Sequence, residues 1–273
     1  MWTKLVIGGL LVVMVAAAVH FKAIRNRALL ASQTRNGPVV RLMTWNIGHD
    51  DQERDSRAHT DDLKAVADVI NSRQPDAVAL QELANPEQLK TLLNLLHRRY
   101  TGAIAPMSNS DRVEAVLVKD QKAQFENVRA GEQYALSATF KPRDAETLVL
   151  ISAHADAFRA ARRRIFTNDI VDWARTRSAT PHVFIAGDLN LEVDTRDQSH
   201  FYTDNLKNDS EAYAYILKYF RDLGRDAGDT SINDRRIDYI FGPRESVLRQ
   251  AQVLGGVAVS RMDHLPLVIE VFL

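Results

Sequence analysis

Residues 182–190 read HVFIAGDLN, a short apolar run that leads directly into a glycine, a carboxylate and an amide. An apolar run of this length, bounded by turn residues, predicts a buried strand. A charged side chain is costly in a protein core unless it is paired or bound to a metal. The position of Asp188 at the end of such a strand therefore marks a candidate functional site.

Other predicted strands end in the same way. Polar groups follow RLMT, DAVAL and LVLISA, and they also interrupt RRIDYIF and MDHLPL; these groups are Asn46, Glu82, His154, Asp238, Asp263 and His264. Each group alone is compatible with a turn residue, a surface carboxylate or a core histidine with satisfied hydrogen bonds. Their number favours one shared site.

Helices and strands alternate along the chain. We predict helices that begin at Thr60 and after Asn85 and that span 158–177 and 210–223, with Leu63, Val66 and Ile70 on the core face of the first. We predict strands at 39–47, 76–80, 113–118, 134–140, 148–153, 182–186, 236–241, 251–259 and 267–272. Several strand neighbours are too close in sequence for a parallel crossover, which indicates mixed sheets. The expected fold is α/β (α+β), with residues 39–273 forming one domain of two packed sheets flanked by helices.

The N-terminal segment differs from the rest of the chain. Fifteen residues, Leu5–Val19, carry no charge or hydrogen-bonding side chain, and a basic flank follows them. Residues 1–27 are therefore expected to be a membrane anchor, or else a signal segment cleaved from a secreted or periplasmic protein; a buried core helix is a third reading. The side of the membrane is left open. Residues 28–38, which end in Asn-Gly-Pro, are expected to be a linker.

The composition excludes several kinds of catalytic and binding site. The chain has 273 residues and no cysteine, which excludes disulfides, thiolate metal sites and cysteine nucleophiles. Its formal charge is zero, but five basic and no acidic residues lie within 1–35, so the remainder is at −5. This balance counts against a protein that coats DNA without regard to sequence.

Taken together, the motifs resemble the endonuclease/exonuclease/phosphatase superfamily, the metal-dependent phosphodiesterases and phosphatases related to deoxyribonuclease I. They occur in the family's order: TWNI (44–47), LQEL (80–83), SAHADAF (152–158), GDLN (187–190), RIDYIF (236–241) and MDHLPL (262–267). The resemblance implies a four-layer αββα sandwich. It also implies hydrolysis of a phosphoester, with a divalent cation and in-line attack by an activated water.

Hydrolysis of this kind needs oxygen ligands for a hard cation, Mg²⁺ or alternatively Mn²⁺ or Ca²⁺. Glu82 is the first candidate ligand and Asp263 is the second. Asn46 is also a candidate metal ligand, or it would position the second ligand or touch the phosphate. One departure bears on this set. Gly48 stands where some nuclease relatives carry a second acidic ligand, so Asp50 or Asp51 would be weak substitutes.

The resemblance also assigns catalytic roles. Asp188 would orient or deprotonate the attacking water, and Asn190 would hold the phosphate or that aspartate. His264 would contact the scissile phosphate, with Asp238 accepting its other N–H. His154 would stabilise the transition state or assist the leaving group.

The sequence indicates the class of reaction more clearly than the substrate. Arg159, Arg162 and Arg163, with Arg164, form a basic cluster that could touch a phosphate backbone or serve only solubility. A monomeric nuclease is the first expectation. A phospholipid or inositol phosphate hydrolase near the membrane is the second, and a catalytically silent binding module on the same fold is the third.

Overall fold

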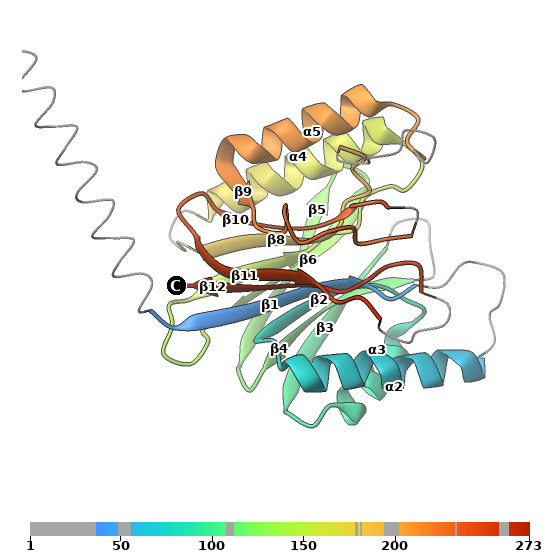
Figure 1. Cartoon of the computed structure of the whole chain (residues 1–273), viewed down its shortest axis with the longest axis vertical. Helices are drawn as coiled ribbons and strands as arrows, with labels where there is room; N and C mark the ends of the chain where they lie inside the picture. Colours follow the sequence, from blue (N-terminus) through green and yellow to red (C-terminus); the bar gives the residue numbers. More distant parts are fainter. Residues whose placement is uncertain are drawn as a thin grey trace, which may run out of the picture.

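The protein forms four layers, in the order helix, sheet, sheet, helix (Figure 1). The structure is a computed structural model that describes residues 37–48, 56–107, 112–177, 180, 182–193, 202–232, 234–256 and 262–273. The expected αββα sandwich of two mixed sheets is thereby confirmed.

The first sheet has six strands in the order β11-β12-β1-β2-β4-β3. Only β1 and β2 run parallel, and every other neighbouring pair is antiparallel. The strands are β1 (Val39–Asn46), β2 (Ala77–Leu83), β3 (Tyr100–Pro106), β4 (Val113–Lys119), β11 (Val247–Val253) and β12 (Leu267–Phe272).

The second sheet also has six strands, in the order β5-β6-β7-β8-β10-β9. Here β7 and β8 form the one parallel pair. The strands are β5 (Ala123–Ala130), β6 (Gln133–Phe140), β7 (Leu148–Ser152), β8 (His182–Asp188), β9 (Phe220–Asp222) and β10 (Asp238–Pro243). Each sheet therefore contains one crossover through a helix, as parallel neighbours require.

Among the described residues, four helices cover the outer faces of the sheets. The first sheet carries α2 (Ser56–Arg73) and α3 (Pro86–Leu95), and the second carries α4 (Ala160–Thr176) and α5 (Leu206–Tyr219) (Figure 1). The side chain of Asn85 accepts a hydrogen bond from the backbone N–H of Gln88, so the predicted N-cap is confirmed.

Apolar side chains fill three layers, one between the sheets and one beneath each helical pair. Strand β8 is buried on both faces, so apolar residues do not alternate with polar ones along it. Phe184 and Ala186 face the other sheet, whereas Val183 and Ile185 face the helices. Each large side chain buried in this way stabilises the fold by about 1.5–3 kcal/mol.

The structure departs from the sequence predictions at several elements. Strands β3, β5 and β9 were not predicted, α2 begins at Ser56 rather than at Thr60, and the predicted helix over 210–223 is α5 followed by β9. Strand β11 begins and ends before the predicted 251–259. β5 was missed because its exposed and half-buried polar residues hide the strand pattern, and only its pairing with β6 defines it.

The predicted membrane segment, residues 1–27, and the predicted linker up to residue 36 lie outside the described residues. Within the described part of the chain, no helix combines the length and apolarity needed to cross a membrane.

Candidate active site

The two parallel strand pairs bring their carboxyl ends together at one end of the sandwich. Asn46 ends β1 and Glu82 lies near the end of β2, while His154 follows β7 and Asp188 ends β8. The two sheets pack face to face. Asn46 and Asp188 are therefore within hydrogen-bond distance, although they are 142 residues apart in the sequence.

Asn46 joins the carboxylates of the two sheets. Its Nδ2 lies 3.0 Å from Glu82 Oε1 and 3.0 Å from Asp188 Oδ2, and its Oδ1 accepts from the backbone N–H of Gly48 at 2.9 Å. In this arrangement Asn46 turns its amide N–H groups towards the carboxylates. It holds them together as a donor, whereas the sequence analysis placed it among the metal ligands.

The backbone at Glu82 is unusual. Glu82 has φ 62°, in the left-handed region, and the pairing of β2 with β4 shifts register between Leu80 and Leu83. Such a bulge re-aims a side chain next to a functional site. A Cβ at Gly48 would lie 2.1 Å from Glu82 Oε2, so an acidic residue at position 48 is incompatible with this placement of Glu82.

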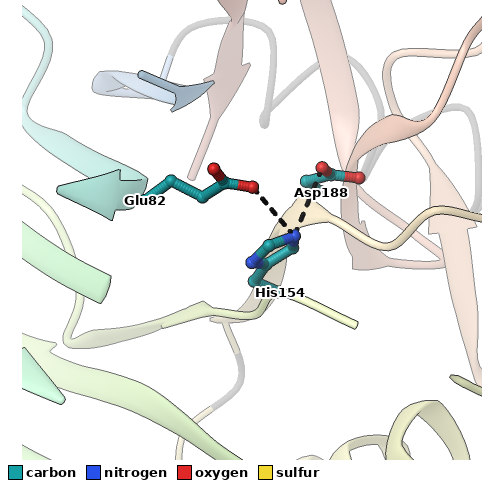
Figure 2. Close-up of side chains that lie close together, drawn as sticks. All are labelled: Glu82, His154 and Asp188. Atoms are coloured by element: carbon teal, nitrogen blue, oxygen red, sulfur yellow. Dashed lines mark ion pairs between the residues drawn. The ribbon is translucent and has the colours of Figure 1, made fainter. Parts of the chain in front are cut away.

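His154 faces both carboxylates, which approach its ring from the two sheets (Figure 2). Its Nε2 lies 3.5 Å from Glu82 Oε1 and 3.5 Å from Asp188 Oδ2. Burial lowers the pKa of His154, more than the nearby Asp188 raises it, so the ring is neutral near pH 7. His154 Nδ1 is buried with no hydrogen-bond partner among the described residues.

Glu114 is a site residue that the sequence analysis missed. It lies in β4, fully buried, and its Oε1 accepts from the backbone N–H of His154 at 3.2 Å. Burial raises the pKa of Glu114 well above its usual value, and the charge of Asp188 raises it further. A glutamate inside the apolar run VEAVLVK was the available signal, the same signal that identified Asp238.

His264 and Asp238 form a buried pair. His264 Nδ1 lies 2.8 Å from Asp238 Oδ2, and His264 Nε2 points towards Asp188 Oδ2 at 3.7 Å. Burial alone would lower the pKa of His264, but Asp238 and Asp188 outweigh it and raise the pKa to about 10. The imidazole is therefore protonated at neutral pH. Thr230 Oγ1 fixes the start of β10 by accepting from the Asp238 N–H at 3.0 Å.

Asp188 and Asn190 form an Asx turn at the end of β8. The backbone N–H of Asn190 donates to Asp188 Oδ1 at 3.0 Å, and Asn190 Nδ2 donates to the carbonyl of Ala155 at 3.1 Å. Asn190 has φ 51°, a conformation that asparagine tolerates better than most residues. A Cβ at Gly187, whose φ is 147°, would lie 1.9 Å from the carbonyl oxygen of Ala153, so β8 needs glycine there.

Of the other predicted residues, Asp263 lies at the exposed rim of this cluster. The side chain of Asp263 is 42% exposed, with Oδ1 at 3.9 Å from His264 Nε2. Asp50 and Asp51 lie outside the described residues. Arg163 corrects the sequence prediction: it is fully buried with its guanidinium on Asp209, so it cannot reach a substrate.

Two groups of described residues could hold a metal ion: Glu82 with His154 and Asp188, and Asp188 with Asp238 and His264. In each group the ligand atoms lie within 4.8 Å of one another. The first group fits a hard cation, because its two carboxylates come from facing strands and Mg²⁺ takes one or two carboxylates while keeping waters. In the second group the His264 and Asp238 atoms already bind each other. Arg112 forms an ion pair with Glu82 Oε2.

The geometry agrees with a sequence match that extends over most of the chain. Residues 43–261 match the family model described as the Endonuclease/Exonuclease/phosphatase family. This chain belongs to the endonuclease/exonuclease/phosphatase family. The resemblance inferred from the six motifs is thereby confirmed. The chain has this family's hydrolase fold, with carboxylates and histidines clustered where the strands end.

Several solved structures share this fold. A functionally unknown conserved protein from Enterococcus faecalis V583 is 20% identical with a TM-score of 0.66, covering 85% of this chain and 99% of that one. A family protein from Bacteroides vulgatus is 16% identical with a TM-score of 0.66, covering 86% and 98%. The human Nocturnin catalytic domain with bound sulfate anion is 17% identical with a TM-score of 0.65, covering 86% and 94%. Among curated proteins, none matches this chain.

Proposed function

We propose that this protein is a divalent-metal-dependent phosphodiesterase that cleaves nucleic acid. The observation that carries the proposal is the meeting of Glu82, Asp188 and His154 from two sheets, with the pair of His264 and Asp238 beside them. A carboxylate pair, a neutral imidazole and a protonated imidazole around one point are the groups that hydrolysis of a phosphodiester needs.

Glu82 would hold the cation, and Asp263 at the rim is a further candidate ligand. A bound divalent ion would supply positive charge to the non-bridging oxygens of the phosphate. The donor set suits Mg²⁺ or Mn²⁺, because it presents carboxylate oxygens rather than soft ligands.

Asp188 is the base in this proposal. Its Oδ1 is held by the Asn190 N–H, and its Oδ2 faces Asn46 at 3.0 Å, His154 at 3.5 Å and His264 at 3.7 Å. With one oxygen fixed and the other directed into the cluster, Asp188 can orient a water for in-line attack and accept its proton.

The two histidines serve different steps because their environments differ. His264, protonated and held by Asp238, donates a charged hydrogen bond to a non-bridging phosphate oxygen as negative charge develops. His154, neutral through burial, donates through Nε2 without repelling the cation. Asn190 keeps Asp188 in place and stands ready to hold the phosphate.

Nucleic acid is the proposed substrate class for two reasons. Nocturnin, which shares the fold, holds a sulfate anion, whose tetrahedral shape and charge resemble a phosphate. The family's name also covers endonucleases and exonucleases. Phospholipids and small phosphoesters are the competing substrates, and a membrane anchor at residues 1–27 would favour them.

The test is a substrate panel with the purified full chain in mild detergent. Single-stranded and duplex DNA, RNA, bis-p-nitrophenyl phosphate and sphingomyelin vesicles are incubated with Mg²⁺ or with EDTA. We expect Mg²⁺-dependent cleavage of a nucleic acid and of bis-p-nitrophenyl phosphate. Asp188→Asn should lower kcat by about 10³-fold or more, whereas Asp144→Asn, the same change in an exposed loop at the other end of β7, should have no effect.

The outcomes separate the candidates. Cleavage of vesicle lipid alone would replace nucleic acid with lipid as the substrate class. Hydrolysis of none of the substrates, or an active Asp188→Asn variant, would contradict the proposed mechanism and favour a binding module.

A further inference from the structure

The four arginines that follow β7 have different environments. Arg163 is bound to Asp209 through two nitrogens at 3.0 Å each, Arg162 lies 3.4 Å from Glu132, and Arg164 pairs with Glu211. Arg159 is exposed, and its side chain has no hydrogen-bond or ion-pair partner within the part of the chain that the structure describes. Among these arginines, Arg159 is therefore the one whose charge is available to a ligand.

Phe158, the residue before Arg159, is 81% exposed. A single exposed apolar side chain is common on protein surfaces. Phe158, however, is held in place: the backbone N–H groups of Phe158 and Arg159 both donate to Asp156 Oδ1 at 2.9 Å. The turn presents an aromatic ring and a free guanidinium on adjacent residues.

This turn lies next to the active site. The residue after His154, Ala155, donates its N–H to the Asp188 carbonyl at 3.0 Å and accepts from Asn190 at 3.1 Å. Phe158 is three positions after Ala155, which limits the distance between their Cα atoms to about 11 Å. Phe158 therefore lies near enough to the cluster to meet a nucleotide that flanks a phosphate bound there.

A second exposed aromatic residue lies on the adjoining loop. Tyr202 is 57% exposed, and the Arg235 guanidinium lies over its ring, 4.3 Å from the centroid. Buried Arg163 ties the two loops together, because it donates to the Asp156 carbonyl at 2.8 Å and to Thr203 Oγ1 at 2.5 Å. The aromatic residues on these loops are thus anchored to the same buried cation.

We propose that Phe158 and Arg159 form a nucleotide subsite beside the scissile phosphate of a single-stranded nucleic acid. The base of the flanking nucleotide stacks on Phe158, and Arg159 contacts its phosphate. The inference rests on the proposed phosphodiesterase activity. Aromatic rings combined with nearby positive charge are the means by which proteins bind single strands, whose bases are free to stack.

Duplex DNA and a membrane surface fit these observations less well. The chain outside residues 1–35 carries a formal charge of −5, which opposes the broad phosphate contact that a duplex requires. Binding to a lipid surface needs a cluster of cationic side chains, and the neighbours of Arg159 in its cluster are occupied by carboxylates.

The experiment measures KM and kcat for single-stranded oligonucleotides that carry either a base or an abasic residue next to the cleaved phosphate. Loss of stacking on Phe158 should raise KM about tenfold. For Phe158→Ala we expect this increase on the oligonucleotide with the base and none on the abasic one. Phe158→Trp should retain the KM of the unsubstituted chain, and kcat should change little throughout.

Arg159→Gln should raise KM on both oligonucleotides and reduce the slope of log KM against log salt concentration by about one. Ile165→Ala, which removes an exposed apolar side chain from the middle of α4, and Arg143→Gln, in the exposed loop between β6 and β7, are the matched controls. Both should behave like the unsubstituted chain.

Three results would overturn the subsite. Phe158→Ala could leave KM unchanged, it could raise KM equally on the base-containing and abasic oligonucleotides, or it could reduce only binding to phosphatidylserine vesicles. Each of these leaves metal-dependent hydrolysis by the unsubstituted chain intact. Absence of that hydrolysis on every substrate would instead overturn the proposed function, and the subsite with it.

Discussion

His264 Nδ1 lies 2.8 Å from Asp238 Oδ2, although the two residues come from segments of different sheets. Asp238 begins β10 and pairs with Asp188 across the sheet, while His264 precedes β12 of the other sheet. Trp45 donates to the His264 carbonyl at 3.1 Å and fixes that backbone. The pair therefore holds the imidazole between the sheets, where it can hydrogen-bond a substrate oxygen through Nε2.

Replacing Asp238 with Asn tests this pair. The amide cannot stabilise a protonated His264 as a carboxylate does, so kcat with Mg²⁺ should fall by about 10²–10⁴-fold. Steady-state kinetics give the change, and circular dichroism checks the fold. A variant with near-normal kcat would show that His264 needs no charged partner.

The protonation of His264 links folding stability to pH. Its pKa is about 10 in the folded protein, against 6.5 for an exposed histidine, so the folded state binds more protons between these values. Stability from this group is complete below pH 6.5 and declines as pH rises towards 10. Urea unfolding in EDTA at about pH 6, 8 and 10 should show this decline, and His264→Gln should show a smaller one. If the unfolding free energy fell equally with pH in both proteins, His264 would not be the group responsible for the decline.

Arg112 competes with a cation for Glu82. Its guanidinium pairs with Glu82 Oε2, so a divalent ion that binds this oxygen would have to displace it, and Arg112 also lowers the negative charge that Glu82 offers a cation. Arg112→Gln should lower the dissociation constant for Mn²⁺ by a factor of about 2–10, measured by calorimetry or electron paramagnetic resonance. Arg143→Gln is the control. Weaker Mn²⁺ binding in Arg112→Gln would mean that Arg112 instead supports the site.

Arg163 and Asp209 form a buried ion pair that we expect to stabilise the loops around the site. Arg163→Met leaves the Asp209 carboxylate, 0% exposed, without its partner, which should cost about 3–5 kcal/mol of unfolding free energy. Chemical denaturation measures the loss. The double variant that combines Arg163→Met with Asp209→Leu should recover much of it, and Arg159→Gln should change stability by less than about 0.5 kcal/mol. If the Arg163→Met single variant were as stable as the unsubstituted chain, the ion pair would not stabilise these loops.

Residues 1–27 remain a predicted membrane segment that contributes none of the clustered site residues, which begin at Asn46. Deletion of 1–27 should move the protein from the membrane fraction to the soluble fraction and leave kcat/KM on oligonucleotides unchanged. Fractionation by centrifugation, followed by the assay, measures both. An aggregated product would indicate that the segment belongs to the fold.

Local pattern was sufficient for much of the architecture. The apolar runs that end in polar groups identified β1, β2, β7 and β8, and the run that Asp238 interrupts identified β10. Buried strands are apolar, and a buried charge is costly unless it is paired or bound to a metal. The order of the motifs identified the family. Strand β3 was missed because Thr101 and Gly102 weaken its pattern, and β11 was misplaced because an edge strand takes its bounds from pairing with β12.

The sequence by itself determined the fold class and the chemical groups of the site, because burial and strand periodicity restrict which residue types occur at neighbouring positions. Only the tertiary structure decided that Asn46 donates to two carboxylates, that Glu114 supports His154, and that Arg163 is buried while Arg159 is exposed. These relationships depend on how two sheets pack against each other. A side chain's partners there come from distant segments, whose approach no local pattern encodes.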